Sequence, residues 1–243
     1  MKKTYRIADR VILIDSLYPD VHKLCGGYEA EGQPEITVCT TEEDIETERI
    51  KSAREDEIEN IPVRIFSPGY LEELAVYRKI AEAMLRYDTF LFHGSVISVD
   101  GEAYIFTAKS GTGKSTHTRL WREYLGERAV MVNDDKPLIS VKNGKALVYG
   151  TPYNGKHGIG NNICVPIKAV AAVERSIENH IGQAEKSELY TLFLQQIYRP
   201  ASIEGLSDTL RLLDAFIESV SLYKLGCNMD ISAARIAYEG MNK

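Results

Sequence analysis

Apolar residues are spaced differently before and after about residue 90. In the first part, residues 4–14 are rich in β-branched side chains, which predicts a strand or a hairpin arm, and residues 34–40 predict a second strand. Residues 61–66 predict a third short strand. Apolar residues then recur every three or four positions from about 70 to 87, which predicts an amphipathic helix that joins this part to the rest of the chain.

After residue 90 the pattern consists of short apolar runs separated by tight turns. Asp100-Gly101 lies between the runs 91–99 and 102–107, and such a dipeptide predicts a hairpin. Asn143-Gly144 predicts a second hairpin in the same way. The other expected elements are the strands 137–141, 145–149, 166–173 and 222–225, a strand from Ala129 to the acidic pair at 134–135, and the helices 117–125, 186–198, 206–219 and 230–239.

A glycine-rich turn stands between the strand 103–107 and the helix 117–125. It reads Ala-Lys-Ser-Gly-Thr-Gly-Lys-Ser-Thr over residues 108–116, close to the phosphate-binding loop (P-loop) pattern, with Ala108 where the pattern has its first glycine. The glycines let successive N–H groups point at one anion, and the helix start adds its positive dipole end. The candidate nucleotide- and phosphate-binding residues are Ser110, Gly111, Thr112, Gly113, Lys114, Ser115 and Thr116. The alternative is a glycine turn without a ligand.

The strand that leads into this loop belongs to an antiparallel pair, whereas most P-loop proteins embed it in a parallel sheet. We therefore expect an α/β (α+β) fold, with a mixed sheet that contains antiparallel hairpins and the P-loop. The expected domains are residues 1–88, a small α+β accessory region with the linking helix, and residues 89–243, a P-loop domain with C-terminal helices.

Lys114 and Ser115 are typical of phosphoryl transfer, in which the lysine reaches the β- and γ-phosphates and the hydroxyl ligates Mg²⁺. Asp134 and Asp135 end an apolar strand, where such enzymes place carboxylates that hold the metal or accept a proton. Adjacent carboxylates repel each other unless a cation lies between them, and Mg²⁺ suits carboxylate and phosphate oxygens. The alternative is a solvated strand end.

Two further segments of the sequence contain candidate catalytic residues. His93 precedes the first predicted hairpin, and a histidine beside a strand is more often structural than catalytic. The glycine-rich segment 150–162 has no periodic apolar face, and it carries Lys156 and His157. Such a loop either brings a cation to a transferring phosphoryl group or is a flexible connector. Trp121, on the helix after the P-loop, is expected in the core.

Residues 42–59 contain nine acidic and three basic residues. We interpret the segment as a solvated loop or an edge element, and a docking surface for a basic partner is the alternative. The net charge of −6 argues against a nucleic-acid partner, and no apolar run is long enough for a membrane span. The four cysteines are scattered and the start lacks a signal-peptide core, so a reducing cytoplasm is expected.

His93-Gly94-Ser95-Val96-Ile97, the Asp-Gly hairpin, the P-loop and Val132-Asn133-Asp134-Asp135 occur in one order. As a set they resemble the C-terminal catalytic domain of HPr kinase/phosphorylase, over about residues 90–175; phosphoenolpyruvate carboxykinases share that fold. The resemblance implies that Asp134 is the general base and that Asp135 and Ser115 hold Mg²⁺. It also implies that His93 lies close to the base and that a cation of the 156–157 loop, Lys156 in our assignment, faces the transferred phosphate.

The sequence therefore predicts a kinase that uses ATP and Mg²⁺ and phosphorylates a hydroxyl, with serine of a peptide or protein favoured. A kinase of a small-molecule hydroxyl is one alternative. A nucleotide-binding regulator or scaffold with little turnover is another, although the Asp134-Asp135 pair argues against it. A small carboxykinase is a weaker alternative, because the chain is short for that class. A homo-oligomer is compatible with the sequence.

Overall fold

The structure is a computed structural model that describes residues 1–58 and 60–242, without the side chain of Lys156. Its internal contacts divide the chain into two compact units, Met1–Ala83 and Met84–Lys243. Each unit is described by itself below. The roles expected for the two parts of the chain, an accessory region and a P-loop domain, stay predictions.

The first unit contains a small three-stranded sheet in the order β1-β2-β3. Its strands are β1 (Lys2–Ile7), β2 (Arg10–Asp15) and β3 (Ile36–Cys39), with β1 antiparallel and β3 parallel to β2. Residues 4–14 thus hold both arms of a hairpin. Ala8 and Asp9 form its turn at positive φ, 48° and 61°. Glycine usually occupies such positions, so its absence hid the turn in the sequence.

Three helices complete this unit: α1 (Asp20–Leu24), α2 (Glu42–Ile58) and α3 (Pro68–Met84), which is followed by a 3-10 turn, η1 (Leu85–Tyr87). The expectation of a loop or edge element at 42–59 was wrong as far as residue 58, and Glu59 lies outside the described residues. Thr41 and Asp44 exchange hydrogen bonds across the start of α2, and acidic residues of the first turn suit the positive helix end. The docking role of this segment stays a hypothesis.

The strand expected at 61–66 is not formed. Instead, the fully buried Asp56 accepts hydrogen bonds from the backbone N–H and the guanidinium of Arg64, which holds this segment without regular secondary structure. A run of β-branched residues therefore does not by itself produce a strand, because a strand also needs a neighbouring strand to pair with.

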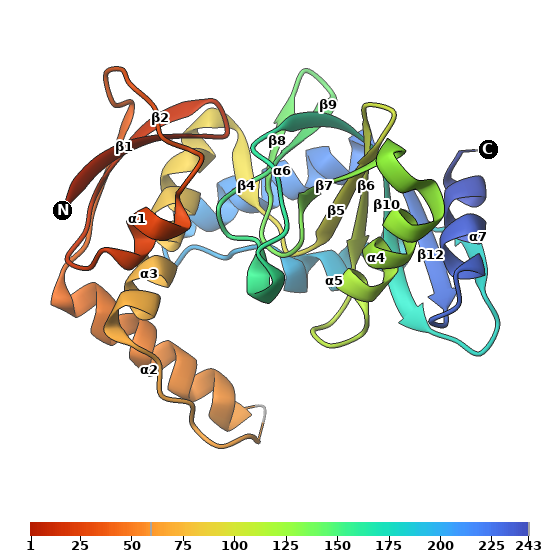
Figure 1. The fold of residues 1–243 in the computed structure, drawn as a ribbon, viewed down its shortest axis with the longest axis horizontal. Helices are drawn as coiled ribbons and strands as arrows, with labels where there is room; N and C mark the ends of the chain where they lie inside the picture. Colours follow the sequence, from red (N-terminus) through yellow and green to blue (C-terminus); the bar gives the residue numbers. More distant parts are fainter. Residues whose placement is uncertain (59, 243) are drawn as a thin grey trace. The chain divides into compact units, whose positions relative to one another are not determined.

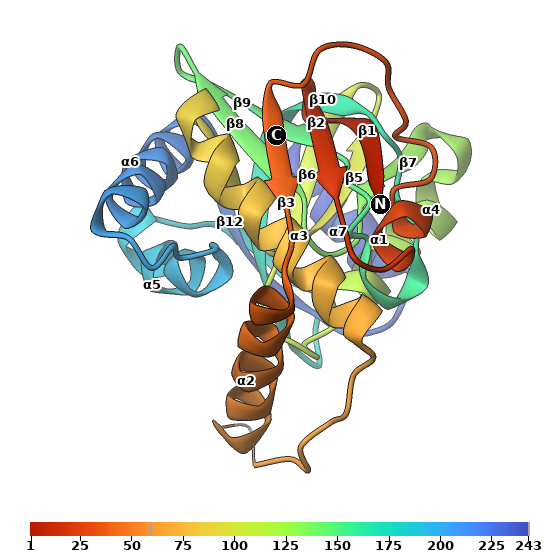
Figure 2. The ribbon, with the colours of Figure 1, turned by 90° about the vertical axis from the view of Figure 1, so that its left-hand side faces the viewer.

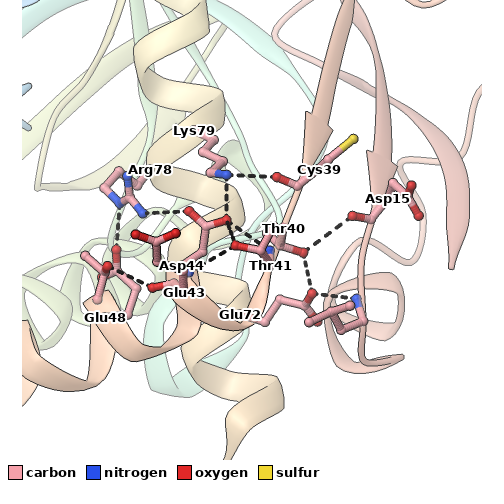
Figure 3. A network of polar contacts seen from close by, with 12 residues as sticks. Asp15, Cys39, Thr40, Thr41, Glu43, Asp44, Glu48, Glu72, Arg78 and Lys79 are labelled. Atoms are coloured by element: carbon pink, nitrogen blue, oxygen red, sulfur yellow. Dashed lines mark hydrogen bonds and ion pairs between the residues drawn. The ribbon is translucent and has the colours of Figure 1, made fainter.

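Carboxylates and cations of α3 hold this unit together (Figure 3). The buried carboxylate of Glu72 accepts hydrogen bonds from the backbone N–H groups of Leu17 and Tyr18, at 2.6 and 2.8 Å, and from the Thr40 hydroxyl. About two turns further on, Arg78 pairs with Glu48 and Lys79 pairs with Asp44, and both carboxylates belong to α2. Few apolar side chains of α2 are buried, so these ion pairs are its main attachment within the described residues.

The second unit contains a nine-stranded mixed sheet with the path β4-β8-β9-β10-β6-β5-β7, and β12 pairs with both β10 and β11. Its strands are β4 (Thr89–Leu91), β5 (Ser95–Val99), β6 (Glu102–Thr107), β7 (Ala129–Asn133), β8 (Leu138–Lys142), β9 (Lys145–Tyr149), β10 (Cys164–Arg175), β11 (His180–Gln183) and β12 (Ser221–Cys227). The expected fold class, a mixed sheet with antiparallel hairpins and an embedded P-loop, is confirmed.

Two details of this sheet differ from the expectation. The run 91–99 is divided, because β4 pairs with β8 whereas β5 pairs with β6. The strand β11 was not predicted, because its sequence is short and mostly polar. The long strand β10 joins the two parts of the sheet: its first residues pair antiparallel with β9, and its remainder pairs parallel with β6 and β12.

Helices cover both faces of the sheet (Figures 1 and 2). On β6, Ala103 and Ile105 face one core, whereas Tyr104 and Phe106 face the other. The helices α5 (Lys186–Gln196) and α6 (Ile203–Ser219) cover the first core, and α4 (Lys114–Leu125) and α7 (Ser232–Met241) cover the second. A strand that is buried on both faces reads as a continuous apolar run, as β6 does. Trp121 lies fully buried in the second core, as expected.

The strand directions place the candidate site. The strands β6, β10 and β12 run parallel, and β7 runs the same way because β5, between β6 and β7, is antiparallel to both. The P-loop after β6 and the carboxylates after β7 therefore leave the sheet at one edge, where β5 begins. Within the part of the chain that the structure describes, no helix has the length and apolar character needed to cross a membrane.

The half-buried Glu73 on α3 makes the stability of the first unit depend on pH. Burial, with the nearby charge of Asp20, raises the pKa of Glu73 from 4.5 to about 6, so the folded state holds a proton that the unfolded chain releases. The stability conferred by the protonated form is complete below pH 4.5 and is lost as the pH rises through 6. We expect Glu73→Gln to raise the free energy of unfolding by about 1–2 kcal/mol at pH 7.5.

The same substitution should have no effect at pH 4, where the wild-type side chain is protonated in both states. Urea unfolding at the two pH values measures the difference. An equal effect at both pH values would contradict this account of Glu73.

Candidate active site

The P-loop joins β6 to α4 and leaves the start of α4 free to bind an anion. Gly111 and Gly113 have positive φ, 74° and 127°, which residues with a side chain rarely adopt. Gly113 is the N-cap of α4, and no side chain caps the helix there. The first N–H groups of a helix have no partner within the helix, so an uncapped start offers them to a ligand.

Lys114 is held within this loop. Its side chain is 8% exposed, and Nζ donates a hydrogen bond to the Ala108 carbonyl at 3.0 Å. Burial lowers the pKa of Lys114, and the charges of Asp135 and Asp134 oppose that effect. The ammonium group and both carboxylates are therefore near enough to interact electrostatically. This is the proximity that the sequence led us to expect of the P-loop and the acidic pair.

Arg175, at the end of β10, holds the loop from outside. Its guanidinium donates hydrogen bonds to the carbonyls of Gly111 at 2.7 Å and of Thr112 at 3.4 Å. In a trans peptide the C=O and N–H groups point in opposite directions. The contact with the Thr112 carbonyl thus turns the N–H of Gly113 away from Arg175. The geometry of the P-loop therefore depends on Arg175, which is not part of the P-loop motif.

Asp134 is 8% exposed and directs its carboxylate into a polar cluster. Its Oδ1 accepts a hydrogen bond from the Ser95 hydroxyl at 2.6 Å, and Ser95 also contacts the Thr118 hydroxyl at 3.0 Å. Asp134 and Ser115 line one cavity of about 290 Å³. The Ser95 hydroxyl thus holds one oxygen of Asp134 in place, and Asp134 lines the same cavity as Ser115 of the P-loop.

Asp135 pairs with His93, whose Nε2 lies 3.2 Å from Oδ1. Burial raises the pKa of Asp135, but the hydrogen bond from His93 and the charges of Lys136 and Lys114 outweigh it, so the pKa is lowered and Asp135 is ionised. From the resemblance we expected His93 to lie close to Asp134, the expected base. In the structure His93 pairs with the neighbouring Asp135 instead. His93 reaches it because β5 begins where β7 ends.

Asn133 shapes the turn that presents both aspartates. Its side-chain oxygen accepts hydrogen bonds from the backbone N–H groups of Asp135 at 2.9 Å and Lys136 at 2.8 Å, and its amide donates to Thr151. Such an Asx turn fixes the backbone directly after a strand. Asn133, in the Val-Asn-Asp-Asp run, therefore has a structural role: it fixes the turn that presents the two aspartates. Its position directly before them suggests this role, whereas an asparagine as such does not reveal it.

The glycine-rich loop 150–162 lies against this turn. A side chain at Gly150 would meet the carbonyl oxygen of Asn161 at 1.8 Å, and Gly155 has a φ of 67° and passes close to Asp135. His157 lines the same cavity as Asp134. The side chain of Lys156, the catalytic cation that we predicted, lies outside the described residues. The loop thus brings His157 to the site, and the role of Lys156 stays a prediction.

A second cavity of about 520 Å³ borders the P-loop on the side of β10 and β12. It is lined by Gly113, Thr116, Cys227 and Met229, among others, and by His117, which is 1% exposed. Burial lowers the pKa of His117 to about 4, so its ring is neutral. Trp121 donates to Nε2 at 2.9 Å, so the ring proton resides on Nδ1, which has no partner among the described residues.

The structure therefore gathers most of the predicted site residues at one sheet edge: the P-loop, Asp134, Asp135 and His93. Sequence reasoning missed Ser95, Arg175 and His117. No short-range pattern could reveal them, because Ser95 lies 39 residues before Asp134 and Arg175 lies 64 residues after Gly111. Ser95 belongs to the His-Gly-Ser-Val-Ile run that carried the resemblance, and that was its only signal.

Magnesium fits the residues present. Among the described residues, no group of three or more His, Cys, Asp or Glu side chains could hold a metal ion. Mg²⁺ commonly takes one or two carboxylates and completes its shell with waters and substrate phosphates. The Ser115 hydroxyl at the start of α4 and the ionised carboxylate of Asp135, whose charge acts on Lys114, are donors of this kind.

No model of a known protein family matches the chain, and no curated protein matches it. A comparison with solved structures finds a likeness to the HPr(Ser) kinase/phosphatase from Coxiella burnetii. The sequence identity is 9% and the TM-score is 0.35, over 63% of this chain and 99% of that chain. A likeness this weak identifies neither a substrate nor an activity, so the function has to be inferred from the site itself.

The contact between Arg175 and the P-loop predicts that Arg175→Gln loosens the loop. We expect faster amide hydrogen exchange over residues 111–115 and binding of inorganic tripolyphosphate that is about 3–10-fold weaker, because a charge-assisted contact to the backbone is lost at an exposed position. Arg235→Gln, an exposed arginine on α7, is the matched control. Unchanged exchange in Arg175→Gln would show that the loop holds its shape without this residue.

Proposed function

We propose that this protein is an ATP- and Mg²⁺-dependent kinase that transfers the γ-phosphate to a hydroxyl group. The observation that carries the proposal is the cavity that Asp134 and Ser115 share at the uncapped start of α4. Phosphoryl transfer requires that the phosphates, their neutralising charges and a proton acceptor for the attacking hydroxyl lie in one place. The P-loop, Lys114 and the two aspartates, which we assign to these tasks, lie close together at this edge of the sheet.

The residues divide into two roles in this proposal. The P-loop N–H groups and Lys114 bind the β- and γ-phosphates of the donor. Ser115 and Asp135 hold Mg²⁺, which neutralises phosphate charge when it is bound. His93 orients the Asp135 carboxylate through its hydrogen bond, so we assign it a positioning role rather than direct contact with the reacting atoms.

Asp134 is the general base in this proposal. Ser95 holds one of its oxygens and leaves the carboxylate at the wall of the cavity, where an acceptor hydroxyl can donate its proton as the oxygen attacks phosphorus. His157, in the same cavity, and Lys156 are the candidates to stabilise charge on the transferred group. The resemblance favours serine of a peptide or protein as the acceptor, and a small-molecule hydroxyl is the alternative.

The cavity of about 520 Å³ supports a nucleoside triphosphate as the donor, rather than an inorganic polyphosphate. Its volume falls within the range of about 300–1,000 Å³ that small-molecule sites have. It lies at the carboxyl ends of the parallel strands β10 and β12, next to the P-loop, and ligands of open α/β sheets bind at such ends. His117, whose ring is neutral, is one of the residues that line it.

Asp134→Asn tests the proposed base. We expect kcat to fall by about 10²–10⁴-fold, because an amide cannot accept the proton, while nucleotide affinity changes little. The measurement is ADP release from Mg·ATP, in buffer and with serine-bearing acceptors. Asp208→Asn, an exposed aspartate on α6, is the control for the change in charge. Equal trace turnover in the wild type and Asp134→Asn would refute the kinase and leave a nucleotide-binding regulator as the function.

The donor is tested by comparing two ligands that share the phosphate chain. ATP should bind at least about tenfold more tightly than inorganic tripolyphosphate, because burying the nucleoside adds apolar contact that the phosphates cannot supply. Isothermal titration calorimetry with Mg²⁺ present measures both. Equal affinities would show that the larger cavity does not take part in donor binding.

A further inference from the structure

Arg122 occupies an unusual position in the cavity that Asp134 and Ser115 share. It lies on α4 and lines that cavity together with Arg119 and His157. Its side chain is half-buried, and its Nε is fully buried with no acceptor among the described residues. By contrast, Arg119 is half-exposed and pairs with Glu123. Arg122 is therefore a half-buried cation that lines the cavity, and no hydrogen bond or ion pair is found for it within the described chain, although its Nε itself is covered by protein atoms.

A guanidinium in such a place favours an anion as its partner. Removing a charged group from water is unfavourable unless a counter-charge and hydrogen bonds replace the water. Asp134 borders the same cavity, but the hydrogen bond found for its carboxylate is the one from Ser95. An incoming carboxylate or phosphate would pair with the two terminal nitrogens of Arg122 in a two-point contact, which arginine forms better than lysine does.

The position of Arg122 on the helix favours the acceptor over the donor as the source of this anion. Ser115, Arg119 and Arg122 follow at spacings of four and three, so they lie on one face of α4. Arg122 is two turns beyond Ser115, about 10 Å along the axis. In the proposed function the phosphates of the donor bind at the very start of the helix, so Arg122 lies past them, in the wall of the cavity that Asp134 also lines.

We infer that the acceptor is a small alcohol that carries a carboxylate or phosphate group, and that Arg122 binds this group while Asp134 faces the hydroxyl. The inference rests on the proposed kinase function and refines its substrate class. The cavity of about 290 Å³ suits a small molecule. A basic peptide would bring positive charge to a cavity wall that already carries two arginines.

Binding rather than turnover tests this inference. The protein is saturated with Mg²⁺ and a non-hydrolysable ATP analogue. It is then titrated calorimetrically with D-glycerate, with glycerol 3-phosphate, with an acidic serine peptide and, as the neutral probe, with glycerol. We expect at least one anion to bind and glycerol not to bind detectably. Arg122→Gln should weaken the anion by about tenfold or more, and Arg122→Lys by less, because lysine keeps the charge but loses the two-point contact.

Arg211→Gln is the matched control, because it removes the same charge from an exposed arginine on α6 that pairs with Asp88. Its affinity for the anions should equal that of the wild type. The thermal unfolding midpoint of each variant shows whether it is folded, and Arg122→Lys preserves the test if Arg122→Gln unfolds.

Four outcomes would overturn the inference: binding of neither anion, equal binding of glycerol, unchanged anion affinity in both Arg122 variants, or preference for an acidic serine peptide over both small anions. If Arg122→Gln weakens the ATP analogue instead, Arg122 belongs to the donor site and the inference also fails. Arg122-dependent anion binding in a protein without ATP turnover would contradict the kinase proposal alone, so the two failures are distinguishable.

Discussion

The strand β5 sets the geometry on which the site depends. It lies between β6 and β7 and is antiparallel to both, so these two strands run in the same direction. The P-loop and the Asp134-Asp135 pair consequently leave the sheet at one edge, and the residues before β5 arrive at that edge. The connection between β6 and β7 is a crossover through α4, which returns the chain to the end of the sheet at which β6 started. The site therefore depends on this crossover helix together with the strand β5 that lies between the two parallel strands.

Polar contacts then convert this placement into fixed side-chain positions. Ser95 holds Asp134, His93 holds Asp135, and Arg175 holds the carbonyls of the P-loop. Ser95 lies on β5, His93 lies in the segment directly before β5, and Arg175 ends β10. A displacement of β5 relative to β10 would therefore move the aspartates' partners relative to the P-loop, so the arrangement needs a rigid sheet below it. Buried apolar layers on both faces of β6 and β10 supply that rigidity.

The first unit shows a different balance, because charged groups do much of the work there. Glu72 is fully buried, and its carboxylate is satisfied by two backbone N–H groups and the Thr40 hydroxyl. Arg78 and Lys79 attach α2 through its acidic residues. The acidic composition that suggested a solvated loop at 42–59 is therefore part of what fastens the helix. Charge density in a sequence predicts exposure only when the charges lack partners from elsewhere in the fold.

The sequence by itself determined the local elements: the hairpin turns at 100–101 and 143–144, the P-loop between a strand and a helix, and the mixed character of the sheet. These follow from backbone preferences and apolar spacing within a few residues. Only the tertiary structure decided that His93 pairs with Asp135, that Ser95 and Arg175 support the site, and that Arg122 borders its cavity. Such contacts join residues far apart in the chain, and the strand order that brings them together is not encoded in any single segment.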